Sequence, residues 1–104
     1  MEIIKLVVRV FENKDDCEMF AAVLEKKLPE LLIPHKDARY RLIINKEQPN
    51  VLLILWEFMS TKTHEEVKMI LKKNIDTHLA HLRHKKIDYT GNTSNDSKST
   101  TGKK

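Results

Sequence analysis

The sequence predicts an α+β domain in which a four-stranded antiparallel sheet carries two helices on one face. Segments rich in branched and aromatic residues alternate with two segments whose apolar residues recur every three or four positions. Their order is strand, helix, strand, strand, helix, strand, which is the ferredoxin-like βαββαβ arrangement. The 104 residues fit one such domain.

The first strand and helix are expected between residues 3 and 29. Residues 3–11 are rich in branched side chains, with uniformly apolar even positions and odd positions that mix apolar residues with Lys5 and Arg9. Asn13 is a favourable helix N-cap, and the helix is expected to end near Pro29. One face of this helix is apolar and holds Cys17, Phe20, Ala21, Leu24 and Leu28.

The second half of the chain repeats the pattern. Residues 38–45 and 51–58 predict two strands joined by a short loop. Thr63 with Glu66 matches a capping box and predicts a second helix of about five turns. A short fourth strand is expected from Lys86 to Tyr89. The apolar positions of the second helix are Val67, Ile70, Leu71, Ile75, Leu79 and Leu82.

The third strand, residues 51–58, is apolar on both faces. Seven of its eight residues are apolar, whereas a half-exposed strand alternates apolar with polar side chains. Helices can cover one face only, and burial of each large aliphatic side chain on the other is worth roughly 1.5 to 3 kcal/mol. The sequence therefore predicts a homodimer formed through the sheet faces. A monomer with a ligand groove or an adhesive face is the alternative.

Composition limits the classes of partner. The net charge is +4, and half of it lies in residues 92–104, so it is too weak to indicate nucleic acid. Residues 92–104 hold no large apolar side chain and are expected to form a disordered polar tail behind a domain of residues 1–91. No apolar run has the length of a membrane span, and the single cysteine, Cys17, cannot form an internal disulfide. A cytoplasmic protein is expected.

The hairpin between the second and third strands predicts a ligand site. If Asn45 pairs with Val51, Tyr40 lies opposite Trp56 and Arg39 lies opposite Glu57. An apolar face with a few polar groups suits a flat, mostly apolar molecule, although a tryptophan and a tyrosine on one face more often belong to a plain core. The expected ligand-binding residues are Trp56, Tyr40, Phe58 and His64, with Arg39 and Arg41 available for an acidic substituent.

Three histidines, His78, His81 and His84, recur every third residue near the end of the second predicted helix. Helical residues are about 100° apart, so the first and third point in different directions and cannot converge on one ion. No metal site is therefore predicted. The three histidines are expected to form a partly exposed cluster at the end of the helix, together with Arg83, Lys85 and Lys86.

Residues 3 to about 90 resemble the antibiotic-biosynthesis-monooxygenase family of dimeric α/β barrels. The resemblance rests on the order and length of the elements and on the segment Trp56-Glu57-Phe58-Met59-Ser60, where the third strand ends just before the second helix. It implies two sheets facing each other across a barrel, and oxygen chemistry on aromatic or quinol-like substrates without a metal, flavin or other cofactor. Haem-degrading relatives use an asparagine on the first strand and a histidine within the second helix. Residues 3–11 contain no asparagine, and positions 66–68 contain no histidine.

The sequence thus favours a cofactor-independent monooxygenase-like protein or a binding protein for a small aromatic ligand. A catalytically silent structural dimer is the alternative. An RNA-binding module shares this element order, but the chain lacks the basic, glycine-containing aromatic motif that such a sheet uses.

Overall fold

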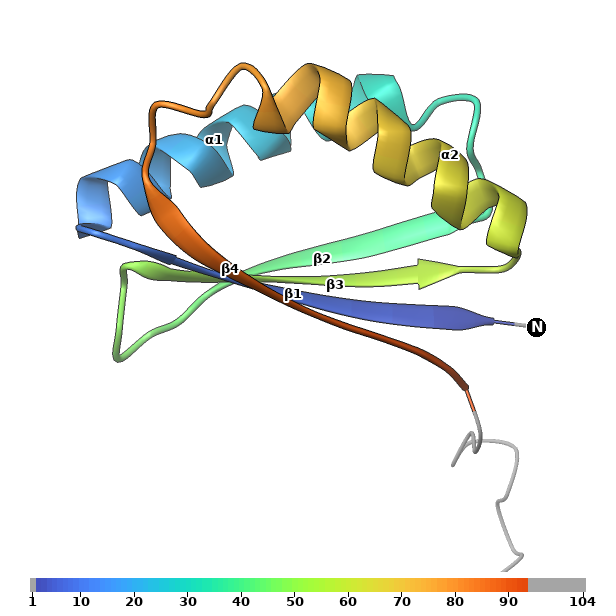
Figure 1. The fold of residues 1–104 in the computed structure, drawn as a ribbon, viewed down its shortest axis with the longest axis horizontal. Helices are drawn as coiled ribbons and strands as arrows, with labels where there is room; N and C mark the ends of the chain where they lie inside the picture. Colours follow the sequence, from blue (N-terminus) through green and yellow to red (C-terminus); the bar gives the residue numbers. More distant parts are fainter. Residues whose placement is uncertain (1, 94–104) are drawn as a thin grey trace, which may run out of the picture.

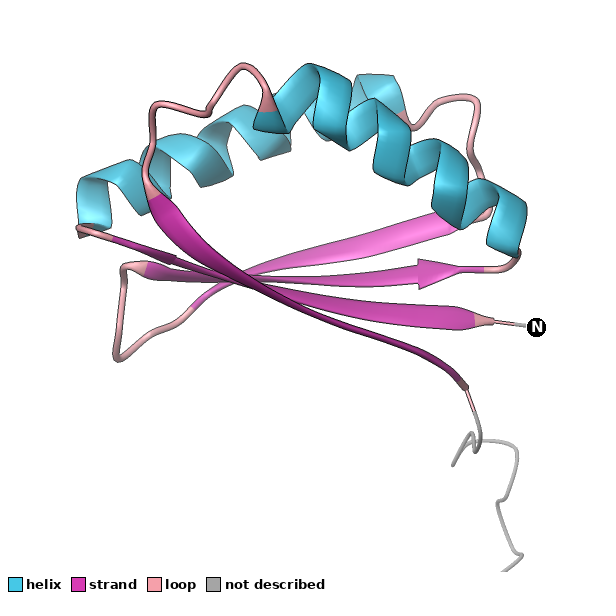
Figure 2. Ribbon diagram, viewed as in Figure 1, coloured by secondary structure: helices cyan, strands magenta, loops and turns pink. Residues whose placement is uncertain are grey.

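A computed structural model describes residues 2–93, and its sheet and helices follow the predicted order. The sheet is antiparallel with strand order β2-β3-β1-β4, and both helices lie on one face of it (Figures 1 and 2). The predicted ferredoxin-like fold class is confirmed. The elements are β1 Ile3–Phe11, α1 Lys14–Leu31, β2 Ala38–Ile44, β3 Val51–Phe58, α2 Thr61–Leu71, a π-helical turn η1 Lys72–Asp76 and β4 His84–Asn92.

The register between β2 and β3 is the one that follows if Asn45 pairs with Val51, a condition that the sequence left open. Tyr40 pairs with Trp56 and Arg39 with Glu57. The Asn45 amide closes the hairpin by donating to the Val51 carbonyl at 3.0 Å. Because alternate residues of a strand point to opposite faces, Trp56 and Arg39 lie on opposite sides of the sheet.

The structure decides which face of β1 points toward the helices, a question that the sequence left open. The mixed odd set points toward the helices, where Val7 and Arg9 are buried and Lys5 pairs with Trp56 of β3. The uniformly apolar even set, Ile4 to Val10, points to the other face of the sheet and is only half-buried. Charged side chains therefore lie between sheet and helices, and the more uniformly apolar face is the one turned outward.

Helix α1 begins as predicted and ends later. The Asn13 side chain accepts a hydrogen bond from the Asp16 amide at 2.8 Å, which caps the first turn. The helix continues past Pro29 to Leu31, because the proline only removes its own donor and the Leu28 carbonyl still accepts from the Leu32 amide at 3.0 Å. The predicted end at Pro29 was therefore two residues early.

The start of α2 corrects the predicted capping box. Ser60, not Thr63, is the N-cap, and its Oγ accepts from the Thr63 amide at 3.1 Å. The Thr63 hydroxyl instead donates to the Asp37 carboxylate at 2.8 Å, which ties the helix to the segment before β2. Thr63 cannot cap a turn of which it is already a member, so the pairing with Glu66 inferred from spacing was wrong.

The predicted five-turn helix is also interrupted. Regular α-helix ends at Leu71, and the π-helical turn η1 follows, in which the Thr77 amide donates to the Lys72 carbonyl at 3.2 Å. A π-helical turn holds more residues than an α-helical one and so rotates the side chains that follow. Ile75 stays buried in the core while Asp76, beside it, lies over the end of β1.

Strand β4 is longer than predicted and pairs with the whole of β1. It runs from His84, opposite Phe11, to Asn92, opposite Ile3. His84 is thus a strand residue, and the predicted helix-ending histidine cluster was wrong in that respect. Asn92 lies one residue beyond the expected domain boundary, and the rest of the expected tail, from residue 94 onward, lies outside the described residues.

The face of the sheet opposite the helices is apolar over its centre and carries charged side chains, such as Arg39, Arg41 and Glu57, toward one edge. No helix of the described part of the chain covers it (Figure 1). Its exposed members include Ile43 at 45%, Ile87 at 39% and Tyr89 at 60%. Within residues 2–93 we also find no helix with the length and apolar character needed to cross a bilayer. Its aliphatic centre comprises Ile4, Leu6, Val8, Val10, Leu53 and Leu55.

Candidate functional site

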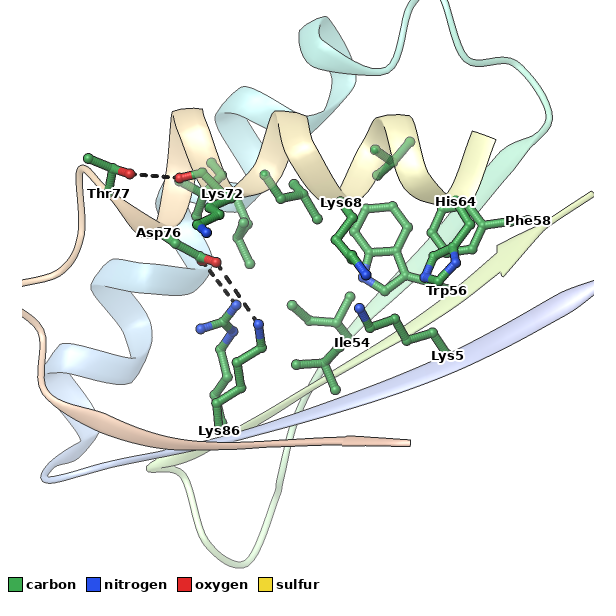
Figure 3. Close-up of a pocket in the computed structure, with 16 residues that line it drawn as sticks. Lys5, Ile54, Trp56, Phe58, His64, Lys68, Lys72, Asp76, Thr77 and Lys86 are labelled. Atoms are coloured by element: carbon green, nitrogen blue, oxygen red, sulfur yellow. Dashed lines mark hydrogen bonds and ion pairs between the residues drawn. The ribbon is translucent and has the colours of Figure 1, made fainter. Parts of the chain in front are cut away.

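A cleft of about 380 Å³ lies between the helix-facing side of the sheet and the helical segment α2–η1 (Figure 3). The strands β1, β3 and β4 contribute its floor, and the helical segment contributes its roof. The volume falls at the lower end of the range typical of small-molecule sites. Apolar side chains line much of the wall, namely Val7, Leu24, Ile54, Val67, Leu71 and Ile75.

The charged lining of the cleft is mostly basic. Five basic side chains line it against a single carboxylate, that of Asp76. A second carboxylate, Asp88 of β4, lies just outside, 3.8 Å from the Lys5 amine. A concave site lined by one sign of charge concentrates ligands of the opposite sign, so this cleft favours an anion. The basic residues are Lys5, Arg9, Lys68, Lys72 and Lys86.

One end of the cleft is aromatic. Trp56 and Phe58 are stacked, with ring centroids 5.4 Å apart and an interplanar angle of 9°. Phe58 in turn lies 5.0 Å from the ring of His64. Trp56 is 2% exposed, and its edge contributes with Phe58 to an aromatic wall at this end of the cleft.

The amines of Lys5 and Lys68 point into the same part of the cleft, beside Trp56 (Figure 3). Lys5 reaches it from β1, where it is the cross-strand partner of Trp56, and Lys68 reaches it from α2. Burial lowers the pKa of Lys5, the Asp88 carboxylate opposes this, and the ammonium groups of Lys86 and Lys68 lower it further. An anion between the two amines would remove part of that repulsion.

His64 lies at the same end, with one ring nitrogen that has no hydrogen-bond partner among the described residues. Its ring is 9% exposed, and its Nδ1 faces the Glu65 carboxylate at 3.9 Å. Its Nε2 is buried and has no hydrogen-bond partner among the residues the structure describes. Burial lowers the pKa of His64 and the ammonium of Lys5 adds to this, while Glu65 opposes it. His64 is therefore neutral at pH 7 and able to accept a proton.

The other end of the cleft is fixed by Arg9. Its guanidinium donates to Asp76 at 3.2 Å and to Nε2 of His84 at 2.7 Å, and it lies 4.7 Å above the Phe20 ring. Since arginine can only donate, His84 must carry its proton on Nδ1, which donates to the Leu82 carbonyl at 2.7 Å. These contacts hold Arg9 rigidly and tie η1 to β1. Lys86, 4.0 Å from the second oxygen of Asp76, extends this network.

The structure brings together three of the residues that the sequence indicated. Trp56, Phe58 and His64 line the cleft. Tyr40 packs against Trp56, with centroids 5.5 Å apart, but does not line it. Arg39 and Arg41 line a separate shallow hollow with Leu55 and Glu57 on the opposite face, so they cannot contact a molecule in the cleft.

Sequence reasoning missed the basic lining. Lys5 and Arg9 interrupt an otherwise apolar set of odd positions in the first strand, and the pairing of that set with Trp56 and Leu52 places it over the cleft. A charged residue within the buried face of a strand was the available signal. Among residues 2–93, no group of three or more histidine, cysteine or acidic side chains is arranged to hold a metal ion.

The comparisons with known proteins concern the fold. No protein-family model matches the chain, and no curated protein matches its sequence. Among solved structures, it is similar to a dimeric ferredoxin-like protein from an uncultured marine organism, with a TM-score of 0.72 and 15% identity over 91% of this chain and 97% of that one. This likeness at low identity shows that the chain has a ferredoxin-like fold.

Two oxygenases share this fold. SnoaB, a cofactor-independent oxygenase from Streptomyces nogalater, has a TM-score of 0.73 and 9% identity over 91% of this chain and 95% of that one. A monooxygenase from the gene ActVA-Orf6 of Streptomyces coelicolor, in complex with the ligand Nanaomycin D, has a TM-score of 0.74 and 5% identity over 90% of this chain and 88% of that one. These likenesses confirm the predicted fold and leave the activity to be argued from the site.

We predict that stability depends on pH through His64. Its pKa in the folded state lies below the unfolded value of about 6.5, so the unfolded chain binds more protons as the pH falls through that value. The free energy of unfolding should therefore decrease between pH 7 and pH 5, and His64→Gln should make this decrease smaller. Urea unfolding across this range measures it, with the exposed His78→Gln as the matched control; equal slopes for both variants and the parent protein would contradict the prediction.

Proposed function

We propose that the protein binds a planar, largely apolar small molecule that carries an acidic group, in the cleft between the sheet and α2. The observation that carries the proposal is the combination of an apolar wall, a flat tryptophan and five basic side chains around one cavity. The apolar wall and Trp56 suit a small fused-ring aromatic. The surplus of basic groups suits an anionic substituent, which Lys5 and Lys68 would contact beside the indole.

The likeness in fold to two oxygenases supports a second proposal, that the bound molecule is oxygenated without a cofactor. A phenol whose ring carries a hydrogen opposite the hydroxyl can supply all four electrons that dioxygen requires. One oxygen atom replaces that hydrogen to give a quinone, and the other leaves as water. Basic side chains support this chemistry because they stabilise the electron-rich phenolate that donates the electrons.

The open sheet face supports a third proposal, a homodimer formed through that face. The aliphatic side chains of β1 and β3 make it apolar across its centre, and Ile43, Ile87 and Tyr89 extend the apolar surface outward. A second copy presents the same surface, so a twofold pairing covers both sheets at once. The similar protein from the marine organism is a dimeric ferredoxin-like protein, which supports the same arrangement.

The binding proposal predicts that 2-naphthoate quenches the fluorescence of Trp56, the only tryptophan of the chain, with saturation. Lys5→Met should weaken this binding about tenfold, because loss of one charge-assisted hydrogen bond costs about 1.5 kcal/mol. The matched control is Lys62→Met, at an exposed position of α2 outside the cleft. An emission that 2-naphthoate leaves unchanged, or equal affinities for the two variants, would refute the proposal.

The oxygenation proposal predicts oxygen uptake when 1-naphthol is added, with a product heavier by one oxygen atom and lighter by two hydrogens. Mass spectrometry under ¹⁸O₂ should find one labelled oxygen in the quinone. Lys5→Met should slow the uptake about tenfold or more, since it removes a charge that stabilises the phenolate, whereas Lys62→Met should match the parent. Uptake no faster than in a protein-free sample, although the ligand binds, would leave a binding protein without this activity.

The dimer proposal predicts a species of twice the 12.2 kDa chain mass in sedimentation equilibrium at micromolar concentration. Val8→Glu, at the centre of the open face, should shift the protein to the monomer, because dimerisation would bury an unpaired carboxylate. Ala22→Glu, on the exposed side of α1, is the matched control. A parent protein that sediments only at 12.2 kDa would exclude the dimer.

A further inference from the structure

The aromatic end of the cleft presents a particular set of hydrogen-bonding groups. The amines of Lys5 and Lys68 can only donate hydrogen bonds. The buried Nε2 of His64 has no hydrogen-bond partner among the described residues, and it is an acceptor in the tautomer that carries the proton on Nδ1, the nitrogen 3.9 Å from the Glu65 carboxylate. A carboxylate can satisfy the amines but has no hydrogen to offer Nε2. A hydroxyl group can do both, since its oxygen accepts from an amine while its hydrogen is donated to the histidine.

We infer that this end of the cleft selects a phenolic hydroxyl and ionises it, with His64 as the group that accepts the proton. The inference rests on the proposed binding of a planar acidic molecule and names its acidic group. In the step, the phenol O–H bond breaks and an Nε2–H bond forms on His64. The electron pair of the O–H bond stays on oxygen, and the resulting phenolate lies beside the ammonium groups of Lys5 and Lys68.

The surroundings of His64 favour this transfer. The groups that face it are Glu65 and Lys68 on its own helix, Lys5 on β1 and the ring of Phe58 on β3. Two ammonium groups disfavour a charged imidazole when no anion is present, which keeps His64 neutral and ready to accept a proton. Once a phenolate forms, its negative charge offsets theirs, so the imidazolium and the phenolate stabilise each other. Glu65, 3.9 Å from Nδ1, stabilises the same imidazolium.

The probe for this inference is 4-nitro-1-naphthol, whose ionised form absorbs visible light. Bound to the protein, it should show the phenolate spectrum at pH values about one to two units below those at which the free probe ionises, the size of shift that adjacent opposite charges produce. Lys5→Met should move the apparent pKa of the bound probe back toward the free value. A bound probe that titrates as it does in water would overturn the inference.

Two further readouts assign the proton to His64. In ¹⁵N spectra of the histidine-labelled protein, Nε2 of His64 should change from an acceptor to a protonated nitrogen when the probe binds, and should not change with 1-nitronaphthalene, which lacks the hydroxyl. His64→Gln should weaken binding of the probe about tenfold and change binding of 2-naphthoate less than twofold. His78→Gln, at an exposed position, is the control for both ligands.

The outcomes separate this inference from the binding proposal. If neither 2-naphthoate, 4-nitro-1-naphthol nor 1-nitronaphthalene quenches the fluorescence of Trp56, the binding proposal itself fails. If they bind but the probe keeps the spectrum of the neutral phenol, or if His64→Gln weakens the naphthoate as much as the nitronaphthol, then the cleft is a site for aromatic anions and the proton-accepting role of His64 is wrong. If His64→Gln does not fold, the ¹⁵N signal of Nε2 in the parent protein, with and without the probe, decides the same question.

Discussion

The sheet is apolar on both faces, whereas the helices form only one layer, and most other features follow from how that conflict is resolved. The helices cover the face that carries Lys5 and Arg9, and the uniformly aliphatic even positions of β1 are left on the other side. Charged groups beneath helices require partners, and Arg9 has them in Asp76 and His84. Aliphatic side chains on the outward face favour association with another molecule. The basic lining of the cleft and the apolar outer face of the sheet therefore have the same origin, namely which face of β1 packs against the helices.

The cleft itself depends on the break in the second helix. A continuous α-helix would place the residues after Leu71 on a regular 3.6-residue period. The π-helical turn from Lys72 to Asp76 adds a residue to that turn, which directs Asp76 toward Arg9 and Lys86 while Ile75 remains in the core. This carboxylate neutralises one end of the cleft. The other end, beside Trp56, keeps two amines, and a functional site at a π-helical turn is a common occurrence.

The sequence predicts the element order and the aromatic residues near the end of the third strand because these depend on local patterns. Trp56 and Phe58 belong to a strand that is apolar at seven of eight positions, whereas the register depends on which residues close the hairpin loop, and the pair Asn45 and Val51 sets it. It does not predict the basic lining, since both faces of β1 are apolar enough to be buried and only the pairing of Arg9 with Asp76 decides between them. The apolar periodicity does not predict η1 either, because Ile75 follows Leu71 at the spacing of a regular helix. The fourth strand looked short because its residues are mostly polar, and its length is set by pairing with β1.

The aromatic end of the cleft holds groups whose positive charge is unfavourable when no ligand is bound. Lys5 is half-buried, and burial and the neighbouring ammonium groups lower its pKa. Burial also lowers the pKa of His64, and the ammonium of Lys5 lowers it further. Burial and nearby ammonium groups thus act on both side chains, and an anion placed beside them would offset part of this cost. Such a site selects ligands by charge more than by shape. Its apolar wall can hold many flat molecules, but its ammonium groups lose hydrogen bonds to water when the ligand has no acceptor group. The neutral imidazole of His64 adds a second criterion for the ligand. It can accept a hydrogen bond only from a group that carries a hydrogen, such as a hydroxyl.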